Sequence, residues 1–374
     1  MKIASLLFTS FCAASLHAAG ALDIYFVDVE IGNAVLLVTP SGQSVLMDAG
    51  SHLPNNRDRD RVMAVIKKAG VKKIDYMVAT HYHNDHYGAI ADLAPLIPIT
   101  NFVDHGAFVQ YGKGPEWYKI WFAIFPFDAE QVPRQDRQFD EYRKVTEQGH
   151  HIVVDAGDKI PLRGLDVTVV TSQGNHLTKA LPGAGRPNPG CASTELRTFD
   201  ATEDAQSVGL VVSYGKFRFV NLGDLTWNKS YELFCPHDPV GKVDLYMVTH
   251  HGMSDPKETG DIDWGRSCCT PAEMQALSPR VAVESCGPQY HKGSSPRGWQ
   301  AVHSTPGVED IWQTNYHPQG GKENNSPEQF IANIPPRTPA SPAFFIHVSV
   351  KPDGSYTVTN ERNNYAKTYE GRKN

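Results

Sequence analysis

The chain has 374 residues, of which 40% are hydrophobic and 20% are charged. This composition is ordinary for a folded globular protein and excludes a disordered chain. The formal net charge of -6 gives no clear charge signature of a nucleic-acid-binding protein. No segment beyond the N-terminus is apolar for long enough to span a membrane, so we expect no membrane span in the mature chain.

The N-terminus has the pattern of an export signal. Lys2 supplies a positive charge, an apolar run opens at Ile3, and small residues follow around Ala18 and Ala19, where a signal peptidase could cut. We expect residues 1–19 to be a signal peptide and residues 20–374 to form a single domain. The protein is then expected to be periplasmic or secreted.

Five cysteines remain after the expected signal peptide: Cys191, Cys235, Cys268, Cys269 and Cys286. No two of them have the CxxC spacing of a zinc ribbon, and an oxidising compartment favours disulfides. Because Cys191 and Cys235 flank the strands that lead to Asp224, we expect a disulfide between these two.

Apolar runs and turn residues predict a mixed α/β chain. The expected strands lie at 22–28, 34–39, 44–48, 74–80, 159–162, 165–170, 208–213, 217–222, 243–248, 344–350 and 356–359. A helix is expected at 59–69, and the aromatic and charged segment at about 108–151 indicates an insertion. That insertion is either a helical cap over the site or a set of helices packed on the core. Hairpins mixed with helix crossovers favour a layered α/β sandwich over a doubly wound sheet.

The strand expected at 74–80 runs directly into the sequence Thr80-His81-Tyr82-His83-Asn84-Asp85-His86. Three imidazoles and one carboxylate thus fall within six residues, on a loop at a strand end, where rigid scaffolds often present functional side chains. On an extended loop His81 and His83 can point the same way, while Asp85 and His86 turn toward a neighbouring position. Nitrogen and carboxylate donors suit zinc, so the motif predicts a metal site.

This HxHxDH motif after an apolar strand resembles the hallmark of the metallo-β-lactamase superfamily. The resemblance implies an α/β fold, namely a four-layer αβ/βα sandwich with two divalent metal ions at one edge. It also implies that His81 and His83 bind the first metal and that Asp85 and His86 bind the second. We expect Zn²⁺, with Mn²⁺ or Fe²⁺ as alternatives.

The resemblance extends to three further strand ends. Asp48, in the sequence LMDAG, matches an upstream aspartate and is expected to orient the HxHxDH loop by hydrogen bonds. Asp224, in LGD, matches the carboxylate that bridges the two metals. In THHG we expect His250 to be the last ligand and His251 to be a neighbouring group or a proton donor, with the reverse assignment as the alternative.

One ligand of the first metal remains to be assigned. The strands expected at 159–162 and 165–170 resemble those that precede the third histidine of the superfamily, and His176 follows them. We therefore expect His176 in that role. His105, at the end of another strand, is the alternative, although it could instead line the substrate pocket.

Several motifs together resemble the hydrolase domain of ComEC-type DNA-uptake proteins over about residues 22–252. They are FVDV, VLMDAG, THYHNDHYGA, LGD and THHG. The chain departs from that group at Glu30 and Asn33, where Gly and Asp are usual, and at His83, where a second histidine is often lacking.

The two resemblances imply a metal-dependent hydrolase that uses a water activated by two metals, and the N-terminal pattern adds that this hydrolase is exported. The ComEC-type motifs favour phosphodiester substrates, either nucleic acids or nucleotides, and Asp85, Asp224 and His251 are the residues expected to carry the chemistry. A lactonase or β-lactamase-type acyl hydrolase acting on a small molecule is the alternative. A third hypothesis is a non-catalytic metal-binding protein that uses the same fold as a scaffold.

Overall fold

A computed structural model describes residues 20–109, 131–197, 202–254, 267–287, 294–338 and 341–372. The expected signal peptide, residues 1–19, lies outside the described residues, as do residues 110–130 of the expected insertion. Within the described ranges, no helix is long and apolar enough to cross a membrane.

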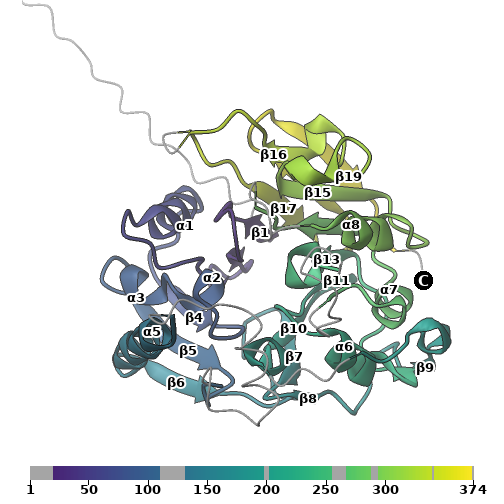
Figure 1. Cartoon of the computed structure of the whole chain (residues 1–374), viewed down its shortest axis with the longest axis horizontal. Helices are drawn as coiled ribbons and strands as arrows, with labels where there is room; N and C mark the ends of the chain where they lie inside the picture. Colours follow the sequence, from purple (N-terminus) through teal and green to yellow (C-terminus); the bar gives the residue numbers. More distant parts are fainter. Residues whose placement is uncertain are drawn as a thin grey trace, which may run out of the picture.

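Two large β-sheets form the centre of the fold (Figure 1). The first has nine strands in the order β19-β18-β17-β1-β2-β3-β4-β5-β6. Their bounds are β1 Leu22–Phe26, β2 Val35–Val38, β3 Ser44–Met47, β4 Ile74–Val78, β5 Ile99–Asp104, β6 His150–Val153, β17 Ile346–Val350, β18 Tyr356–Asn360 and β19 Tyr365–Tyr369. The run from β3 to β6 is parallel.

The second sheet has eight strands in the order β16-β15-β14-β13-β11-β10-β7-β8. Their bounds are β7 Asp166–Ser172, β8 Asn175–His176, β10 Gly209–Tyr214, β11 Phe217–Asn221, β13 Leu245–Met247, β14 Val281–Glu284, β15 Asp310–Asn315 and β16 Ile331–Asn333. The strands from β11 to β16 are parallel, whereas β7, β8 and β10 pair antiparallel with their neighbours. A small separate sheet pairs β9 Arg186–Pro187 with β12 His237–Asp238.

Helices cover the outer face of each sheet. In Figure 1, α1, α3 and α5 lie beside the first sheet, and α6 and α7 lie beside the second. The α-helices are α1 Arg57–Lys68, α2 Asn84–Tyr87, α3 Ile90–Leu93, α5 Gln131–Thr146, α6 Trp227–Phe234, α7 Pro271–Leu277 and α8 Pro296–His303. The short 3-10 helices are η1 Pro189–Ser193, η2 Glu203–Gln206, η3 Thr249–Gly252, η5 Pro318–Gly320 and η6 Glu328–Phe330.

Alternation along β1 shows how the layers arise. Ile24 and Phe26 face the core between the two sheets, whereas Tyr25 faces the core between the first sheet and its helices. Phe26 meets Phe219 of β11 edge to face, with 5.9 Å between the ring centroids. Because both faces of the strand meet apolar layers, the strand is apolar at nearly every position. The resulting order of helix, sheet, sheet and helix is the expected four-layer αβ/βα sandwich.

Two sequence-based expectations change in detail. The described part of the segment at about 108–151 supplies α5 and the edge strand β6, and Tyr142 of α5 packs in the same core as α1 and α3. This part therefore packs on the core, the second of the two alternatives. The strand expected at 159–162 is reduced to one bridge between Lys159 and Thr168, because Pro161 has no N–H to donate to a ladder.

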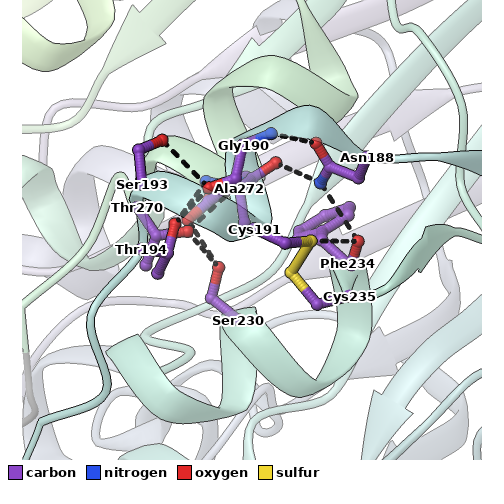
Figure 2. Close-up of a disulfide and its surroundings, with 11 residues drawn as sticks. Asn188, Gly190, Cys191, Ser193, Thr194, Ser230, Phe234, Cys235, Thr270 and Ala272 are labelled. Atoms are coloured by element: carbon purple, nitrogen blue, oxygen red, sulfur yellow. Dashed lines mark hydrogen bonds between the residues drawn. A yellow bond between two sulfur atoms is a disulfide. The ribbon is translucent and has the colours of Figure 1, made fainter.

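A disulfide joins Cys191 of η1 to Cys235 at the end of α6, with 5.8 Å between the Cα atoms, which confirms the expected pair. Figure 2 shows Asn188 beside it. The side-chain amide of Asn188 donates hydrogen bonds to the carbonyl oxygens of Phe234 and Ala272, at 3.0 and 2.8 Å. The disulfide and Asn188 together hold η1, α6 and α7 against one another.

The double substitution Cys191→Ser with Cys235→Ser is expected to lower the free energy of unfolding. The bridge spans a sequence separation of 44 residues, and loop-closure entropy for a loop of this length is worth about 4 kcal/mol. Urea unfolding of both proteins measures the difference. Dithiothreitol should destabilise the wild type and leave the double variant unchanged. An equal response of both proteins to the reductant would contradict the assignment.

Candidate metal centre

The candidate site lies at one edge of both sheets, where parallel strands end. In the first sheet, Asp48 and His105 directly follow β3 and β5, and His81 comes three residues after β4. In the second sheet, Asp224 and His250 come three residues after β11 and β13. The carboxyl ends of parallel strands share one edge of a sheet, which is where open α/β sheets place ligands.

The HxHxDH loop is held by the buried carboxylate of Asp48. This carboxylate accepts hydrogen bonds from the backbone N–H and the hydroxyl of Thr80, at 2.8 and 2.9 Å, and from the side-chain amide of Asn33 at 3.2 Å. His86 places its Nδ1 2.8 Å from the same carboxylate. The Nε2 atom of His86 is thereby directed away from Asp48 and into the site.

Four groups of buried side chains bring possible ligand atoms within 4.8 Å of one another. The groups are His81, His83 and Asp204; His81, His86 and Asp224; Asp85, His86 and His251; and Asp204, Asp224 and His250. Because the groups share members, they form one continuous cluster.

Asp224 lies at the centre of this cluster. Its Oδ2 is 3.2 Å from Nε2 of His86 and 3.4 Å from Nε2 of His251. The same oxygen is 3.5 Å from Nε2 of His250 and 3.8 Å from Nε2 of His81. One carboxylate oxygen therefore faces imidazoles from both halves of the cluster, which is the placement that a bridging ligand needs.

His251, and not His250, joins Asp85 and His86. The Nε2 atom of His251 lies 3.2 Å from Nε2 of His86, and its Nδ1 lies 3.1 Å from the carbonyl oxygen of Ser285. An imidazole with one nitrogen against a carbonyl and the other facing the cluster has the arrangement usual for metal-binding histidines. The sequence favoured His250 as the last ligand, whereas this geometry corresponds to the alternative, in which His251 is the ligand.

His250 lies on the other side of the cluster, with Asp204 and Asp224. Both His250 and His251 have left-handed backbone, with φ of 48° and 53°. In a strand, consecutive side chains would point to opposite faces. The left-handed turn is the reason why both rings reach one cluster.

Asp204 is a member of the cluster that the sequence analysis did not identify. Its Oδ1 is 2.7 Å from Nδ1 of His83 and 3.4 Å from Nε2 of His81. It lies in η2, ahead of β10, and β10 is the neighbour of the strand that ends near Asp224. The available signal was the acidic pair Glu203-Asp204 shortly before an apolar strand.

His176, the expected third ligand, lies outside all four groups. It is half-buried at the end of β8 and pairs with Thr171 of β7. Because β7 and β10 separate β8 from β11, His176 lies three strand spacings from β11, or about 14 Å. The fold therefore places Asp204, rather than His176, beside His81 and His83.

His105, the alternative third ligand, reaches the cluster through Glu203. Its Nε2 is 2.6 Å from Oε1 of Glu203, and the same oxygen accepts the backbone N–H of Tyr82 at 3.0 Å. The other oxygen of Glu203 accepts the N–H of Val109 at 2.9 Å. Since Tyr82 stands between the two histidines of HxH, the buried Glu203 holds that segment in place, next to Asp204.

The charges of the cluster stabilise one another. Burial would raise the pKa of Asp224, but His251, His86 and His250 hold that pKa well below its ordinary value. Burial would lower the pKa of His86, but Asp224 and Asp48 raise it well above its ordinary value. Because a metal binds the neutral imidazole, metal binding is expected to release protons.

The donor set fits two divalent metals. Buried imidazole nitrogens and carboxylate oxygens are ligands for zinc, manganese and iron. One position lies among His81, His83 and Asp204, and the other among Asp85, His86 and His251. Asp224 contacts both halves of the cluster.

Glu284, at the end of β14, is a buried carboxyl group near His251. Burial raises its pKa from 4.5 to about 7, against the opposing effects of Ser294, Gln313 and His251. The folded protein therefore binds this proton more tightly than the unfolded chain does. The resulting stability is fully present below about pH 4.5 and is lost as the pH rises toward 7.

The substitution Glu284→Gln is expected to make the protein relatively more stable at pH 8 than at pH 4, compared with the wild type. A shift of this size corresponds to about 3 kcal/mol over that interval. Urea unfolding of chelator-treated protein at several pH values measures it. The exposed Glu147→Gln control should follow the wild-type pH dependence. Parallel curves for Glu284→Gln and the wild type would refute the prediction.

Residues 27–180 match the family model described as the metallo-beta-lactamase superfamily. This segment contains the whole HxHxDH motif, and the mixed α/β architecture is consistent with the metallo-β-lactamase fold. Over residues 27–180, less than half of the chain, the sequence is therefore similar to this superfamily. A comparison with curated proteins gave no match.

Solved structures with a similar fold include three with low sequence identity. Igni18, a metallo hydrolase from Ignicoccus hospitalis, is 13% identical, with a TM-score of 0.40 and coverage of 78% of this chain and 94% of that chain. A diphosphatase from the PhnP family is 12% identical, with a TM-score of 0.38 and coverage of 77% and 94%. CmlA, a diiron β-hydroxylase from Streptomyces venezuelae, is 13% identical, with a TM-score of 0.39 and coverage of 78% of this chain. The chain spans only 48% of that CmlA structure.

Proposed function

We propose that this protein is an exported hydrolase that depends on two divalent metal ions and cleaves phosphodiesters in nucleic acids or nucleotides. The observation that carries the proposal is the position of Asp224, whose Oδ2 lies within 3.8 Å of imidazoles from both halves of the cluster. A carboxylate in this position can hold two ions side by side, as hydrolytic two-metal sites require.

The proposal assigns ligand roles to seven side chains. The first position takes His81, His83 and Asp204, the second takes Asp85, His86 and His251, and Asp224 is shared between them. When bound, two divalent ions would acidify a water and polarise the scissile group. Asp48 and Glu203 position the segment that carries the ligands. His250 is not a ligand in this proposal and acts as a proton donor.

His250 is suited to protonate the departing oxygen. It is buried, and its Nε2 is 3.5 Å from Oδ2 of Asp224. Histidine also titrates in the range that proton transfer near neutral pH requires. If this role holds, His250→Ala lowers kcat strongly for alkyl phosphodiesters and much less for nitrophenyl esters, whose leaving group needs no proton. An equal loss for both substrate types would contradict it, and retention of two metals separates this role from ligation.

The choice of phosphodiesters follows the resemblance to ComEC-type hydrolase domains in the motifs at Asp48, His81, Asp224 and His250. An acyl hydrolase, either a lactonase or a β-lactamase-type enzyme, is the second candidate. It is favoured by the superfamily match over residues 27–180, because two-metal chemistry acts on carbonyl as well as phosphoryl groups.

A substrate panel on purified, metal-loaded protein tests the proposal. The panel contains a dialkyl phosphodiester, single-stranded DNA, a lactone and a β-lactam, and metal content is measured in parallel. Turnover of phosphodiesters that is lost after chelation and restored by Zn²⁺ or Mn²⁺ supports the proposal. Turnover of only the lactone or the β-lactam would transfer the protein to the second candidate. Full metal loading without turnover of any class would overturn an enzymatic role.

Export is part of the same proposal. The Cys191–Cys235 disulfide supports it, because disulfides persist mainly in oxidising compartments. Sequencing the N-terminus of the protein from its native host should find a start near Ala19 to Leu22. An intact Met1 on the mature chain would exclude the proposed signal peptide.

A further inference from the structure

A cavity of about 650 Å³ lies at the end of the second sheet opposite to the metal cluster. Its walls come from β9, β12, the turn between β10 and β11, and the segment before β13. Lys216 of this turn precedes β11, whereas Asp224 follows the other end of that strand. The length of β11 and its flanks separates the two places by on the order of 20 Å.

The cavity is strongly cationic although the chain is acidic overall. The whole sequence has 41 acidic and 35 basic residues, yet only two carboxylates, Asp238 and Asp244, line the cavity. The basic residues that line it are Arg186, Lys216, Arg218, Lys242 and Arg372. The local excess of positive charge therefore reverses the sign of the molecule as a whole.

Both carboxylates are buried and engaged by the protein. Asp238 accepts the backbone N–H groups of Val240 and Gly241, each at 2.9 Å. Asp244 accepts the backbone N–H of Arg218 and the Nε–H of Arg372, each at 2.9 Å. Their oxygens serve to shape the wall and compensate the cations only in part.

Three of the cations remain available to a ligand. Arg186, Lys216 and Lys242 are exposed, and no ion pair within the described ranges involves them. Arg218 is fixed in the wall because its guanidinium donates to the carbonyl oxygens of Val240 and Pro182, at 2.6 and 3.0 Å. Neutral carbonyls hold its orientation without cancelling its charge.

The wall that carries Arg186 is rigidly attached. The backbone of Arg186 in β9 lies opposite that of Asp238 in the antiparallel pair of β9 and β12. The Cys191–Cys235 disulfide connects the chain segments that leave β9 and enter β12 (Figure 2). A preorganised wall lowers the entropy cost of ligand binding.

We propose that this cavity binds a phosphate-bearing small molecule of nucleotide size, separately from the metal centre. Its volume falls in the usual range of ligand pockets, about 300–1,000 Å³. Arginine and lysine are the side chains that recognise phosphate. Phe217, Pro182 and Ala276 add apolar wall for the uncharged part of such a ligand. The proposal does not depend on the chemistry of the metal centre.

Calorimetric titration of the full chain with adenosine monophosphate tests the site. The titrated protein carries Asp224→Asn and is treated with chelator, so that the phosphate cannot bind to metal. Binding is expected to weaken at least about tenfold in the double variant Lys216→Glu with Lys242→Glu. The matched control, Lys72→Glu with Lys144→Glu, makes the same charge change at exposed lysines outside the cavity and should bind like the parent.

Two further ligands complete the experiment. Adenosine, which lacks the phosphate, should not bind, and inorganic phosphate should bind more weakly than the nucleotide. Equal affinity in the two double variants, or no nucleotide binding at millimolar concentration, would overturn the proposal. If inorganic phosphate binds as tightly as the nucleotide, the cavity does not recognise the uncharged part of the ligand. The proposal of a nucleotide-sized ligand would then be overturned in favour of a site for the free anion.

Discussion

Asp224→Asn is expected to lower kcat/KM by more than about 100-fold, the upper end of the loss seen for residues that only orient ligands. The substitution keeps the volume of the side chain but removes the charge that faces His86, His250 and His251. Without the negative charge of a shared carboxylate, two neighbouring metal cations would repel each other more strongly. The metal content should therefore fall together with turnover. Steady-state kinetics and metal analysis of the same preparation measure both.

The matched control for this variant is Asp48→Asn. Asp48 is also buried and carboxylic, but it contacts the ligand loop through Thr80 and His86. Its loss should be about 10- to 100-fold, smaller than that of Asp224→Asn. Full activity with two metals in Asp224→Asn would falsify the bridging role. Equal losses in both variants would reduce Asp224 to a positioning residue.

Asp204→Asn is expected to reduce bound metal from about two equivalents to about one, because two-metal sites fill both positions when intact. The carboxylate of Asp204 lies 2.7 Å from Nδ1 of His83 and 3.4 Å from Nε2 of His81. The amide of asparagine is a weaker metal donor than a carboxylate, so the first position should empty while the second stays filled. Metal analysis after dialysis gives the stoichiometry independently of turnover.

His176→Ala is the control for this second experiment. His176 lies in β8, outside the cluster, and its removal should leave two equivalents of metal and unchanged kinetics. The opposite pattern, with metal lost in His176→Ala and retained in Asp204→Asn, would restore the third histidine that the superfamily resemblance implied.

The layers of the fold could be predicted because each strand shows, in its own sequence, which of its faces are apolar. The alternation of Ile24, Tyr25 and Phe26 between two cores is visible as an unbroken apolar strand, and such strands need cover on both faces. The predicted bounds of individual elements differ from the structure, as two cases show. Pro161 prevents a ladder in an otherwise apolar run, and α1 begins at Arg57, two residues before the predicted start.

The site residues that are close together in the sequence could be predicted, whereas those that come from distant segments could not. The residues from His81 to His86 share one short segment that runs from the end of β4 into α2, so their proximity follows from spacing alone. Asp204 and His176 are distinguished only by strand order, since β10 lies next to β11 and β8 lies at the sheet edge. That order depends on packing between distant segments, which spacing does not encode. The choice between His250 and His251 depends on the backbone angles after β13.

Asp48, His250 and His251 all have left-handed backbone, with φ of 57°, 48° and 53°. This conformation costs a residue with a side chain roughly 1–2 kcal/mol relative to the right-handed one, and glycine would adopt it freely. Selection for thermal resistance alone should therefore enrich glycine or asparagine at these three positions. Selection for turnover should retain aspartate and histidine, so parallel selections from one library would diverge there first.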